Sequence, residues 1–448
     1  MNTDTVRFIG TTVRIQPPGF PATPIDARLV PQPSEVIAPP EPRVPIADQR
    51  TRPVERIVPS MAAPVTSVAR RPQGDIVVRE VKTRRDRDAF IKFPWRIYEG
   101  DKNWSPPLLL EVKAFLDPRK HPFYLHGAAT QFLAYDQGQL VGRVLVSDDP
   151  NYNEQHETNT GCFGMFECID DQDVASALLD AAANWLRRRG RTQMLGPIDY
   201  STNNPCGLLI EGFDTPQRVM MNHNPPYYAR LLEGWQLTKA KDLYAWWFDD
   251  SCDMLHKWAK RAERFAGRGG AVVRPLSHAN FDAEVARCHD AYNRSWEKSW
   301  GFVKMTDAEF HHMAFELKKY AAPELILLAE VDGEPAGLCI TLPDFNEATR
   351  PLNGRLTTLG IPIGLARLLY NMRHIKSGRM AVLGVVEKFR RRGVVEMFIL
   401  RSLAAGLALG YTGAELSWTL EDNDLINRTI EKVGGRRYKT FRLFHTDL

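Results

Sequence analysis

The most informative part of this chain is Val382-Leu-Gly-Val-Val-Glu-Lys-Phe-Arg390-Arg-Arg-Gly393-Val-Val. An apolar strand runs into a short loop with three arginines and one glycine, and the loop opens directly into a helix. The first amides of a helix have no internal partner and its dipole is positive there, so this corner suits a diphosphate. Gly393 lets the backbone approach such a ligand closely, and Arg390–Arg392 add positive charge. The alternative is a tight turn with solvated arginines.

Strands and helices alternate around this corner, over residues 270–448. Strands are predicted at residues 271–274, 325–331, 336–342, 380–386, 414–418 and 436–445, and helices at residues 281–298, 307–319, 394–409 and 422–433. The same order appears earlier, with strands at residues 76–81, 131–135, 139–146, 162–169 and 192–195 and helices at residues 86–98 and 174–190. The pattern predicts an α/β (α+β) fold of two tandem copies, each a mixed central sheet flanked by helices.

The chain is predicted to contain two domains and a tail. Residues 1–72 hold 14 of the 31 prolines and no lysine, which predicts a disordered, proline-rich tail. Residues 73–250 form the first copy, residues 251–269 a charged linker helix, and residues 270–448 the second copy, which carries an insertion at residues 343–379.

The composition, 44% hydrophobic and 25% charged, is that of a soluble globular protein, and a net charge of +4 argues against a nucleic-acid partner. The six cysteines form no CxxC pair and no histidine lies at metal-ligand spacing, so neither a disulfide framework nor a metal site is expected. The N-terminus lacks the apolar core of a signal peptide, and no apolar run is long enough to span a bilayer. A cytoplasmic location is expected, with peripheral contact at the inner membrane surface left open.

The segment from Arg390 to Val395 resembles the pyrophosphate signature of the GCN5-related N-acetyltransferases (GNAT), Q/R-x-x-G-x-G/A. Arg390 and Gly393 match it, and Val395 replaces its last small residue. Residues 421–435 resemble the second GNAT motif, in which Asn423 opens a helix and a glycine ends it. The resemblance covers residues 270–448 well and residues 75–250 by architecture only. The chain is therefore identified as a tandem GNAT protein, similar to bacterial N-acetyltransferases of uncharacterised type and, through its insertion, to GNAT-type bacterial ceramide synthases.

The resemblance implies acyl-CoA as co-substrate and no metal. In GNAT folds the fourth and fifth strands splay apart, and the pantetheine arm lies between them. This implies that Val385, Val386 and Asn423 lie beside the cofactor. It also implies a diphosphate site made of Arg390, Arg391, Arg392, Gly393, Val394 and Val395.

An amine must lose a proton before it attacks a thioester, so the reaction needs a base. Glu415, on the fifth strand, and Glu421, just past its end, are the candidates, and each is equally consistent with a solvated charge. Many GNAT proteins place a tyrosine seven residues after the motif asparagine as the acid for the leaving thiolate. Here Ile430 stands at that position, which leaves Tyr438 or water as the acid. No Cys, Ser or His constellation indicates a covalent intermediate, so direct attack is expected.

The corresponding loop of the first copy, Ile169-Asp-Asp-Gln-Asp173, has three carboxylates and no glycine. These carboxylates would cap a helix but repel a diphosphate, so the first copy is predicted to be a degenerate GNAT-like domain on the acceptor side. The turn-rich residues 200–207, 211–213 and 222–228 are either ordered turns or walls of the acceptor cleft, with His223 as a further candidate base. Residues 296–302, with two tryptophans and a phenylalanine, either contact the acceptor or belong to the core.

The insertion has one apolar helical face and several cations. The apolar residues are Ile361, Leu365, Leu368, Leu369, Met372 and Ile375, and the cations are Arg367, Arg373, Lys376 and Arg379. Such a segment either covers a long acyl chain, rests on an anionic membrane, or packs across the two copies. Packing across the copies is the favoured interpretation.

The predicted function is acyl-CoA-dependent transfer of an acetyl or longer acyl group to a small-molecule or lipid amine, such as a sphingoid base. One alternative is an aminoacyl-tRNA-dependent transferase of the Fem type, which also pairs two GNAT-like domains. Such a protein would need a broad basic face to bind tRNA, and the Arg390–Gly393 loop argues against it. The other is a non-catalytic CoA-binding sensor or scaffold. Val395 and Ile430 are consistent with this alternative, because both depart from the pattern of the catalytic family.

Overall fold

A computed structural model describes residues 5–8, 11–14, 76–249, 270–277, 279–318, 321–357, 360–432 and 434–448. The chain forms two units, Met1–Ala69 and Arg70–Leu448. In the first unit, β1 (Thr5–Phe8) pairs antiparallel with β2 (Thr11–Arg14). No strand was predicted in this region, although its threonines and valines favour extended backbone. The rest of the predicted tail, and the predicted linker helix at residues 251–269, lie outside the described residues.

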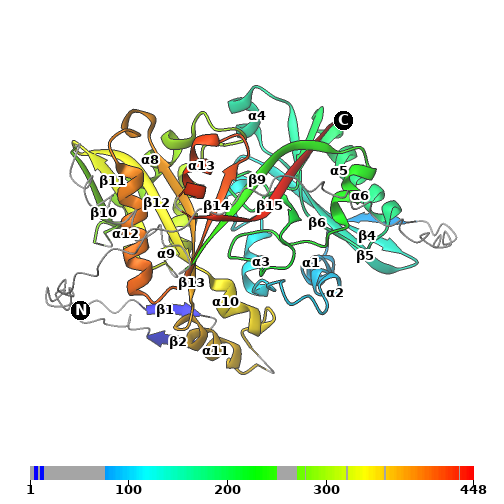
Figure 1. The fold of residues 1–448 in the computed structure, drawn as a ribbon. Helices are drawn as coiled ribbons and strands as arrows, with labels where there is room; N and C mark the ends of the chain where they lie inside the picture. Colours follow the sequence, from blue (N-terminus) through cyan, green and yellow to red (C-terminus); the bar gives the residue numbers. More distant parts are fainter. Residues whose placement is uncertain are drawn as a thin grey trace, which may run out of the picture. The chain divides into compact units, whose positions relative to one another are not determined.

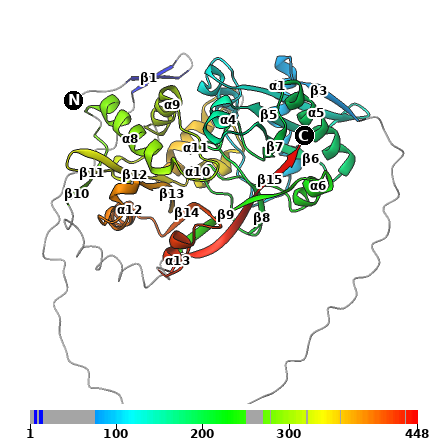
Figure 2. The same ribbon diagram turned by 90° about the horizontal axis from the view of Figure 1, so that it is seen from above.

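The second unit is built on one sheet of thirteen strands, which Figures 1 and 2 show from two sides. The first half of the unit, residues 76–249, contributes β3 (Val77–Glu80), β4 (Ala128–Asp136), β5 (Gln139–Asp148), β6 (Thr160–Cys168), β7 (Gln193–Gly196), β8 (Leu208–Glu211) and β9 (Thr238–Asp249). The second half, residues 270–448, contributes β10 (Ala271–Pro275), β11 (Ile326–Val331), β12 (Glu334–Pro343), β13 (Ser377–Val385), β14 (Gly413–Leu420) and β15 (Arg436–Asp447). The strand order is β10-β11-β12-β13-β14-β9-β15-β7-β6-β5-β4-β3, and β8 pairs with β15.

Helices flank this sheet in both halves. Those of the first half are α1 (Arg84–Lys92), α2 (Pro94–Ile97), α3 (Leu109–Phe115), η1 (Pro122–Leu125), α4 (Pro150–His156), α5 (Gln172–Arg188) and α6 (Tyr228–Gly234). Those of the second half are α8 (Phe281–Trp296), α9 (Asp307–Lys318), η2 (Pro323–Leu325), α10 (Phe345–Thr349), η3 (Arg350–Leu352), α11 (Ile363–Met372), η4 (Glu387–Phe389), α12 (Val394–Ala408) and α13 (Asp424–Lys432). A mixed sheet flanked by helices confirms the predicted fold class.

The last strand of each half lies within the other half's part of the sheet. β9 ends the first half but pairs with β14, and β15 ends the second half but pairs with β7. β9 and β15 also pair with each other, and Figure 1 shows them running together through the middle of the sheet. The two predicted copies therefore share a single sheet.

One predicted helix is divided in the structure. The helix expected at residues 86–98 is observed as α1 followed by α2, and Pro94 is the first residue of α2. Proline has no amide hydrogen to continue the α1 ladder, but it is well suited to the first turn of a new helix. The two halves also contain elements that were not predicted, among them α4, α6 and β9.

The two faces of the second half are covered by different helices. Val394 and Phe398 of α12 pack with Leu327 and Ala329 of β11, while Val285 of α8 packs with the intervening Leu328. Because successive residues of a strand point to opposite faces, α12 and α8 lie on opposite sides of the sheet. The equivalent of α12 in the first half is α5, whose apolar face packs on β4, β5 and β6.

The insertion packs across the two halves, as favoured from the sequence. Leu368 of α11 joins an apolar cluster with Leu352 and with Leu108 of the first half. The Leu109 amide donates to the Gly354 carbonyl at 3.0 Å, and the indole of Trp95 donates to the Asn353 side chain at 2.7 Å. The predicted apolar face is buried only in part, because Ile361 and Leu369 are exposed.

No helix in the part of the chain that the structure describes is long and apolar enough to cross a membrane. The described residues also contain no group of three or more His, Cys, Asp or Glu placed to hold a metal ion.

Candidate functional site

The separation of β13 from β14 organises the candidate site. The two strands run parallel and pair from Ser377 to Met380 and from Gly413 to Leu416, and the pairing ends there. β13 then continues along β12 and β14 along β9, so a gap opens between them toward their carboxyl ends. This is the separation that the resemblance implied.

The backbone of β13 presents Val385 to this gap and turns Val386 away from it. The Val386 amide donates to the Ala336 carbonyl at 2.9 Å and therefore faces β12. Because the backbone groups of neighbouring strand residues point to opposite sides, the Val385 amide and carbonyl face the gap. Of the two valines predicted beside the cofactor, Val385 is the one whose backbone groups a ligand in the gap would meet.

The start of α12 has the geometry expected of an anion site. Gly393 directly precedes α12 and has a φ of +74°, a left-handed conformation that glycine adopts without steric cost. Val394 is buried and Val395 packs against the same core, so these residues present mainly their backbone amides at the corner. The first amides of α12 have no acceptor within the helix, and its dipole adds partial positive charge.

The three arginines of the loop differ in their surroundings. All three are exposed at the surface. Arg390 turns back toward the sheet, where its Nε donates to the Val385 carbonyl at 3.3 Å and its Nη2 to the Ser295 carbonyl at 3.4 Å. Arg390 therefore braces the end of β13 in this structure, while Arg391 and Arg392 supply charge at the surface.

Glu415 is fully buried at the point where β13 and β14 begin to separate. Its carboxylate accepts hydrogen bonds from the Ser417 and Tyr438 hydroxyls, and its Oε1 lies 3.3 Å from the Nε of Arg379. Burial, and secondly the charge of Glu415, raises the pKa of Tyr438 and keeps its phenol protonated. A carboxylate in contact with a neutral hydroxyl forms a pair through which a proton can pass.

Arg379 connects this pair to a loop of the first half. Its buried guanidinium donates to the carbonyls of Val219 and Met220 at 2.8 and 3.0 Å, and to the Ser417 hydroxyl at 3.0 Å. Burial lowers the pKa of Arg379, and the charge of Glu415 opposes this shift. The structure thereby brings residues 219 and 220, which lie between two segments predicted as walls of the acceptor cleft, against the Glu415 side of the sheet.

Two more cations hold the same loop in place. The Nη1 of Arg218 lies 3.0 Å from Asp344, and its guanidinium stacks over the ring of Trp247 at 4.2 Å. Lys439 donates to the carbonyls of Gly212 and Thr215 at 3.1 and 3.0 Å, and burial lowers its pKa to about 8. Several buried or half-buried cations therefore surround the Glu415 carboxylate.

The other predicted residues lie elsewhere. Glu421 lies past the carboxyl end of β14, where it pairs with Lys239 and accepts from the Asp242 amide at 3.1 Å. Asn423 is exposed at the start of α13 and accepts from the Ile426 amide at 3.5 Å. Ile430 is buried, and an added Cβ on Gly435 would lie 2.5 Å from it, so this position belongs to the core. The structure brings together Glu415 and Tyr438 but not Glu421.

His223 is held away from the Glu415 pair. Its Nε2 bonds to the Asp101 carboxylate at 2.7 Å, and its carbonyl accepts from the Tyr98 hydroxyl. Burial, opposed by Asp101, lowers the pKa of His223. These contacts indicate that His223 has a structural role within the first half.

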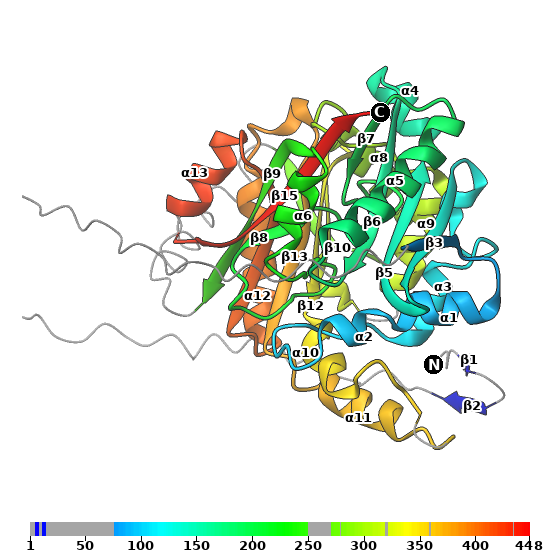
Figure 3. The same ribbon diagram turned by 90° about the vertical axis from the view of Figure 1, so that its right-hand side faces the viewer.

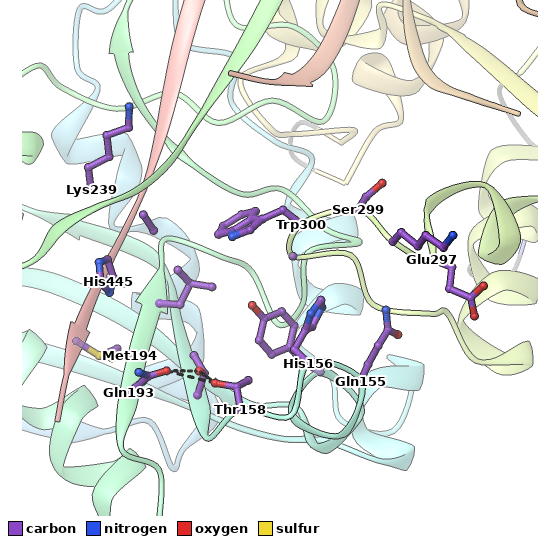
Figure 4. A pocket seen from close by; sticks show the side chains of 16 residues that line it. Gln155, His156, Thr158, Gln193, Met194, Lys239, Glu297, Ser299, Trp300 and His445 are labelled. Atoms are coloured by element: carbon purple, nitrogen blue, oxygen red, sulfur yellow. Dashed lines mark hydrogen bonds between the residues drawn. The ribbon is translucent and has the colours of Figure 1, made fainter. Parts of the chain in front are cut away.

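An open pocket of about 580 Å³ lies at the other end of β14 from Glu415. Figure 4 shows Trp300 reaching into it between Lys239 and His156, with Gln193 and His445 on the far wall. Trp300 also lies 5.4 Å from the ammonium of Lys241. Residues 296–302 were predicted either to belong to the core or to contact the acceptor. Trp296 packs on Gly384 and Phe302 is buried, so these two belong to the core. Trp300 instead lines the pocket.

In the first half, the equivalent gap is filled by the chain itself. β6 and β7 run parallel and pair only from Thr160 to Cys162 and from Gln193 to Leu195. Beyond that point the Ile198 amide donates to the Phe163 carbonyl at 2.6 Å, and the Asp199 carboxylate accepts from the Met165 amide at 2.9 Å. At the helix that follows, Asp171 accepts from the Asp173 and Val174 amides, as its loop predicted.

A buried carboxylate beside this filled gap makes a testable contribution to stability. Glu167 accepts from the Tyr98 and Tyr228 hydroxyls, both at 2.8 Å, and burial raises its pKa to about 7. The folded state therefore binds more protons than the unfolded state between about pH 4.5 and 7, so this group's stabilising effect is present at low pH and is lost as pH rises through 7.

We expect Glu167→Gln to remove this pH dependence. The free energy of unfolding of the variant, relative to the parent chain, should rise by about 1.4 kcal/mol per pH unit between pH 4.5 and 7 and level off above. Urea unfolding of both proteins across this range measures the slope. A constant difference between them would contradict the assignment.

Several residues of the Glu415 cluster were not identified from the sequence. Arg379 was assigned to the cationic insertion, and Arg218, Ser417 and Lys439 were not singled out. A signal was present for Arg379, because it is the one charged residue of β13, whereas Lys439 stands among several other charged residues of β15. Ser417 and Arg218 are common surface residue types, and only the fold places them beside Glu415.

Known proteins resemble this chain in sequence and in fold, although no family model matches it. Bacterial ceramide synthase of Caulobacter vibrioides is 37% identical over 381 residues, which cover 84% of this chain and 98% of that protein. Protein YghO of Escherichia coli is 34% identical over 378 residues, which cover 83% of this chain and 95% of that protein.

A solved tandem GNAT protein from the clavulanic acid biosynthesis pathway has a similar fold, with a TM-score of 0.51 at 12% identity, over 83% of this chain and 98% of that one. Sequence identity extends over nearly the whole of both curated relatives, and the fold is that of a tandem GNAT protein. The chain therefore belongs to the tandem GNAT family that includes bacterial ceramide synthase and YghO.

Proposed function

We propose that this protein is an N-acyltransferase that moves an acyl group from acyl-CoA to an amine by direct attack, at the gap between β13 and β14. The observation that carries this proposal is the arrangement of that gap. One end has the start of α12 with Gly393, and the other has the buried Glu415–Tyr438 pair.

The diphosphate of CoA would bind at the first amides of α12, with Arg391 and Arg392 adding charge. The pantetheine arm would extend along β13 and bond to the backbone of Val385. The thioester would then reach the point where the strands meet, beside Glu415. Two features argue against a second diphosphate site in the first half: Asp171 already caps the equivalent helix, and residues 197–199 occupy the equivalent gap.

In the proposed reaction the amine nitrogen forms a bond to the thioester carbon, and the carbon–sulfur bond breaks. The nitrogen loses a proton to Glu415. The leaving thiolate gains a proton from Tyr438, which is reprotonated by Glu415, so the proton lost by nitrogen ends on sulfur and both side chains return to their starting state. Arg379 and Ser417 are positioning residues that hold the Glu415 carboxylate.

The acceptor we propose is a long-chain amine such as a sphingoid base, and the donor a long-chain acyl-CoA. Support comes from the relative named bacterial ceramide synthase, since ceramide is an N-acylated sphingoid base. The first half, which places residues 218–221 beside Glu415, would form the acceptor side of the site.

This proposal is tested by incubating the full chain with acetyl-CoA or palmitoyl-CoA and with sphinganine or a polar amine such as spermidine. Thiol release and mass spectrometry of the amide are measured together. We expect equal amounts of CoA and N-palmitoyl sphinganine. Turnover of acetyl-CoA with spermidine alone would overturn the lipid acceptor, and CoA binding without turnover of any pair would instead support a non-catalytic sensor.

A further inference from the structure

The helix α11 has two faces that differ in their surroundings. Its inner face carries Leu368, which belongs to the apolar cluster shared by the two halves, and the buried Gly364, which lies against the backbone of Arg355 and Leu356. Its outer face carries Ile363, Arg367 and Tyr370, which recur at i, i+4 and i+7, and His374 follows just past the end of the helix; all four are exposed. The inner face explains why the helix is held in place. The outer face has no such partner among the described residues.

The outer face exposes more apolar surface than an isolated surface residue would. The side chains that share it or flank it, here called the α11 surface, are Ile361, Ile363, Leu369 and Tyr370, with exposed fractions of 58%, 47%, 46% and 65%. They come from ten consecutive positions of the chain. Exposed apolar residues gathered in this way mark an interaction site rather than ordinary surface variation.

Exposed cations surround the α11 surface. Arg355, Arg367, Arg373 and Lys376 are exposed, and none of them forms an ion pair with a residue that the structure describes. Among the described residues, the one acidic side chain with a hydrogen bond to any of these four is Glu347, which accepts from the Lys376 backbone amide at 2.7 Å. No aspartate or glutamate occurs between Glu347 and Glu387, in a chain that has 54 acidic residues among 448. Several acidic residues would be expected in such a span, so this stretch of the chain carries a net positive charge.

We propose that the α11 surface docks this protein on an anionic lipid bilayer. A helix whose outer face combines apolar and aromatic side chains with arginine and lysine is suited to the boundary between headgroups and acyl chains. The apolar side chains enter that boundary, and the cations bind lipid phosphates. The positive charge favours a bilayer over a protein partner. Four separate cations need anionic partners spread over a broad surface, and lipid phosphates provide such a surface.

The position of the α11 surface is compatible with access to the candidate site. The insertion immediately precedes β13, and the Arg390–Gly393 loop immediately follows it, so the two lie at opposite ends of this strand. Figures 1 and 3 show α11 and α13 correspondingly at opposite ends of the strands. A protein docked through α11 would keep the diphosphate corner away from the bilayer, in water.

Vesicle flotation of the full chain without substrates tests this proposal and is independent of the proposed chemistry. The probes are vesicles of phosphatidylcholine alone and of phosphatidylcholine mixed with phosphatidylglycerol. We expect binding to the mixed vesicles that weakens with added salt. The double variant Ile363→Glu/Tyr370→Glu and the double variant Arg367→Glu/Arg373→Glu should each lower binding about tenfold or more.

Val272→Glu is the matched control, since Val272 is 57% exposed on β10, the outermost strand of the sheet. This variant should float with the mixed vesicles as the parent chain does. Equal binding by the parent chain and both double variants would overturn the proposal. The proposal would also fail if the parent chain did not bind the vesicles and sedimented as a dimer, while the double variants sedimented as monomers. The α11 surface would then be a contact between two copies of the chain.

Discussion

Glu415→Gln is expected to lower kcat for amide formation about 10²- to 10⁴-fold, the range typical for loss of a general base. The KM for acyl-CoA should change little, because the side chain acts only on the attacking amine and the leaving sulfur. The glutamine keeps the shape of the side chain and still accepts from Tyr438, but it leaves the buried Arg379 guanidinium without its ionised partner, so the melting temperature should fall. Steady-state kinetics with palmitoyl-CoA and sphinganine, alongside a melting curve, measures both effects.

Glu421→Gln is the matched control for this experiment. Both residues belong to the β14 region and both were candidates for the base, but the Glu421 carboxylate is engaged with Lys239 and the Asp242 amide beyond the end of the strand. Its kcat should stay within about threefold of the parent value, as for a surface charge that does not contact the reacting atoms. A large loss in Glu421→Gln with full activity in Glu415→Gln would reverse the assignment.

Gly393→Asp is expected to raise the KM for acyl-CoA roughly 30- to 150-fold. A carboxylate about 5 Å from a diphosphate charge costs about 2–3 kcal/mol at an effective dielectric constant of about 20–40. The same carboxylate is favourable for the folded state, since it lies at the positive end of the α12 dipole. Compared with an uncharged side chain at this position, the aspartate should therefore weaken CoA binding and stabilise the fold.

Gly393→Asn separates the charge from the backbone conformation. Aspartate and asparagine tolerate the left-handed conformation of Gly393 to a similar degree, but only aspartate adds negative charge. Most of the increase in KM should be absent in the asparagine variant. Equal effects of the two substitutions would mean that the corner does not hold the diphosphate.

The elements of the second half could be predicted because each has a clear local pattern. The predicted helix at residues 394–409 is observed at Val394–Ala408, and the glycine before it adopts the left-handed conformation that the motif requires. The corner at Arg390–Gly393 depends only on residues that are neighbours in the sequence. Its geometry was therefore accessible from the sequence, whereas its ligand remains a proposal.

The exchange of β9 and β15 could not be predicted, because it depends on which strands pair at long range. The sequence of β9, Thr-Lys-Ala-Lys-Asp-Leu-Tyr-Ala-Trp-Trp-Phe-Asp, favours a strand but does not specify β14 as its partner. Arg379 was misread for a related reason. It was counted with the exposed cations of the insertion, but it is the third residue of β13 and is buried against Glu415.

Titration calorimetry of the full chain with palmitoyl-CoA is the most direct test of the central claim, that the protein has one acyl-CoA site and that it lies in the second half. We predict one molecule bound per chain, with binding strongly weakened in Gly393→Asp and unchanged in Asp171→Asn, which alters the equivalent helix start in the first half. Two molecules per chain, or full binding by Gly393→Asp, would contradict it.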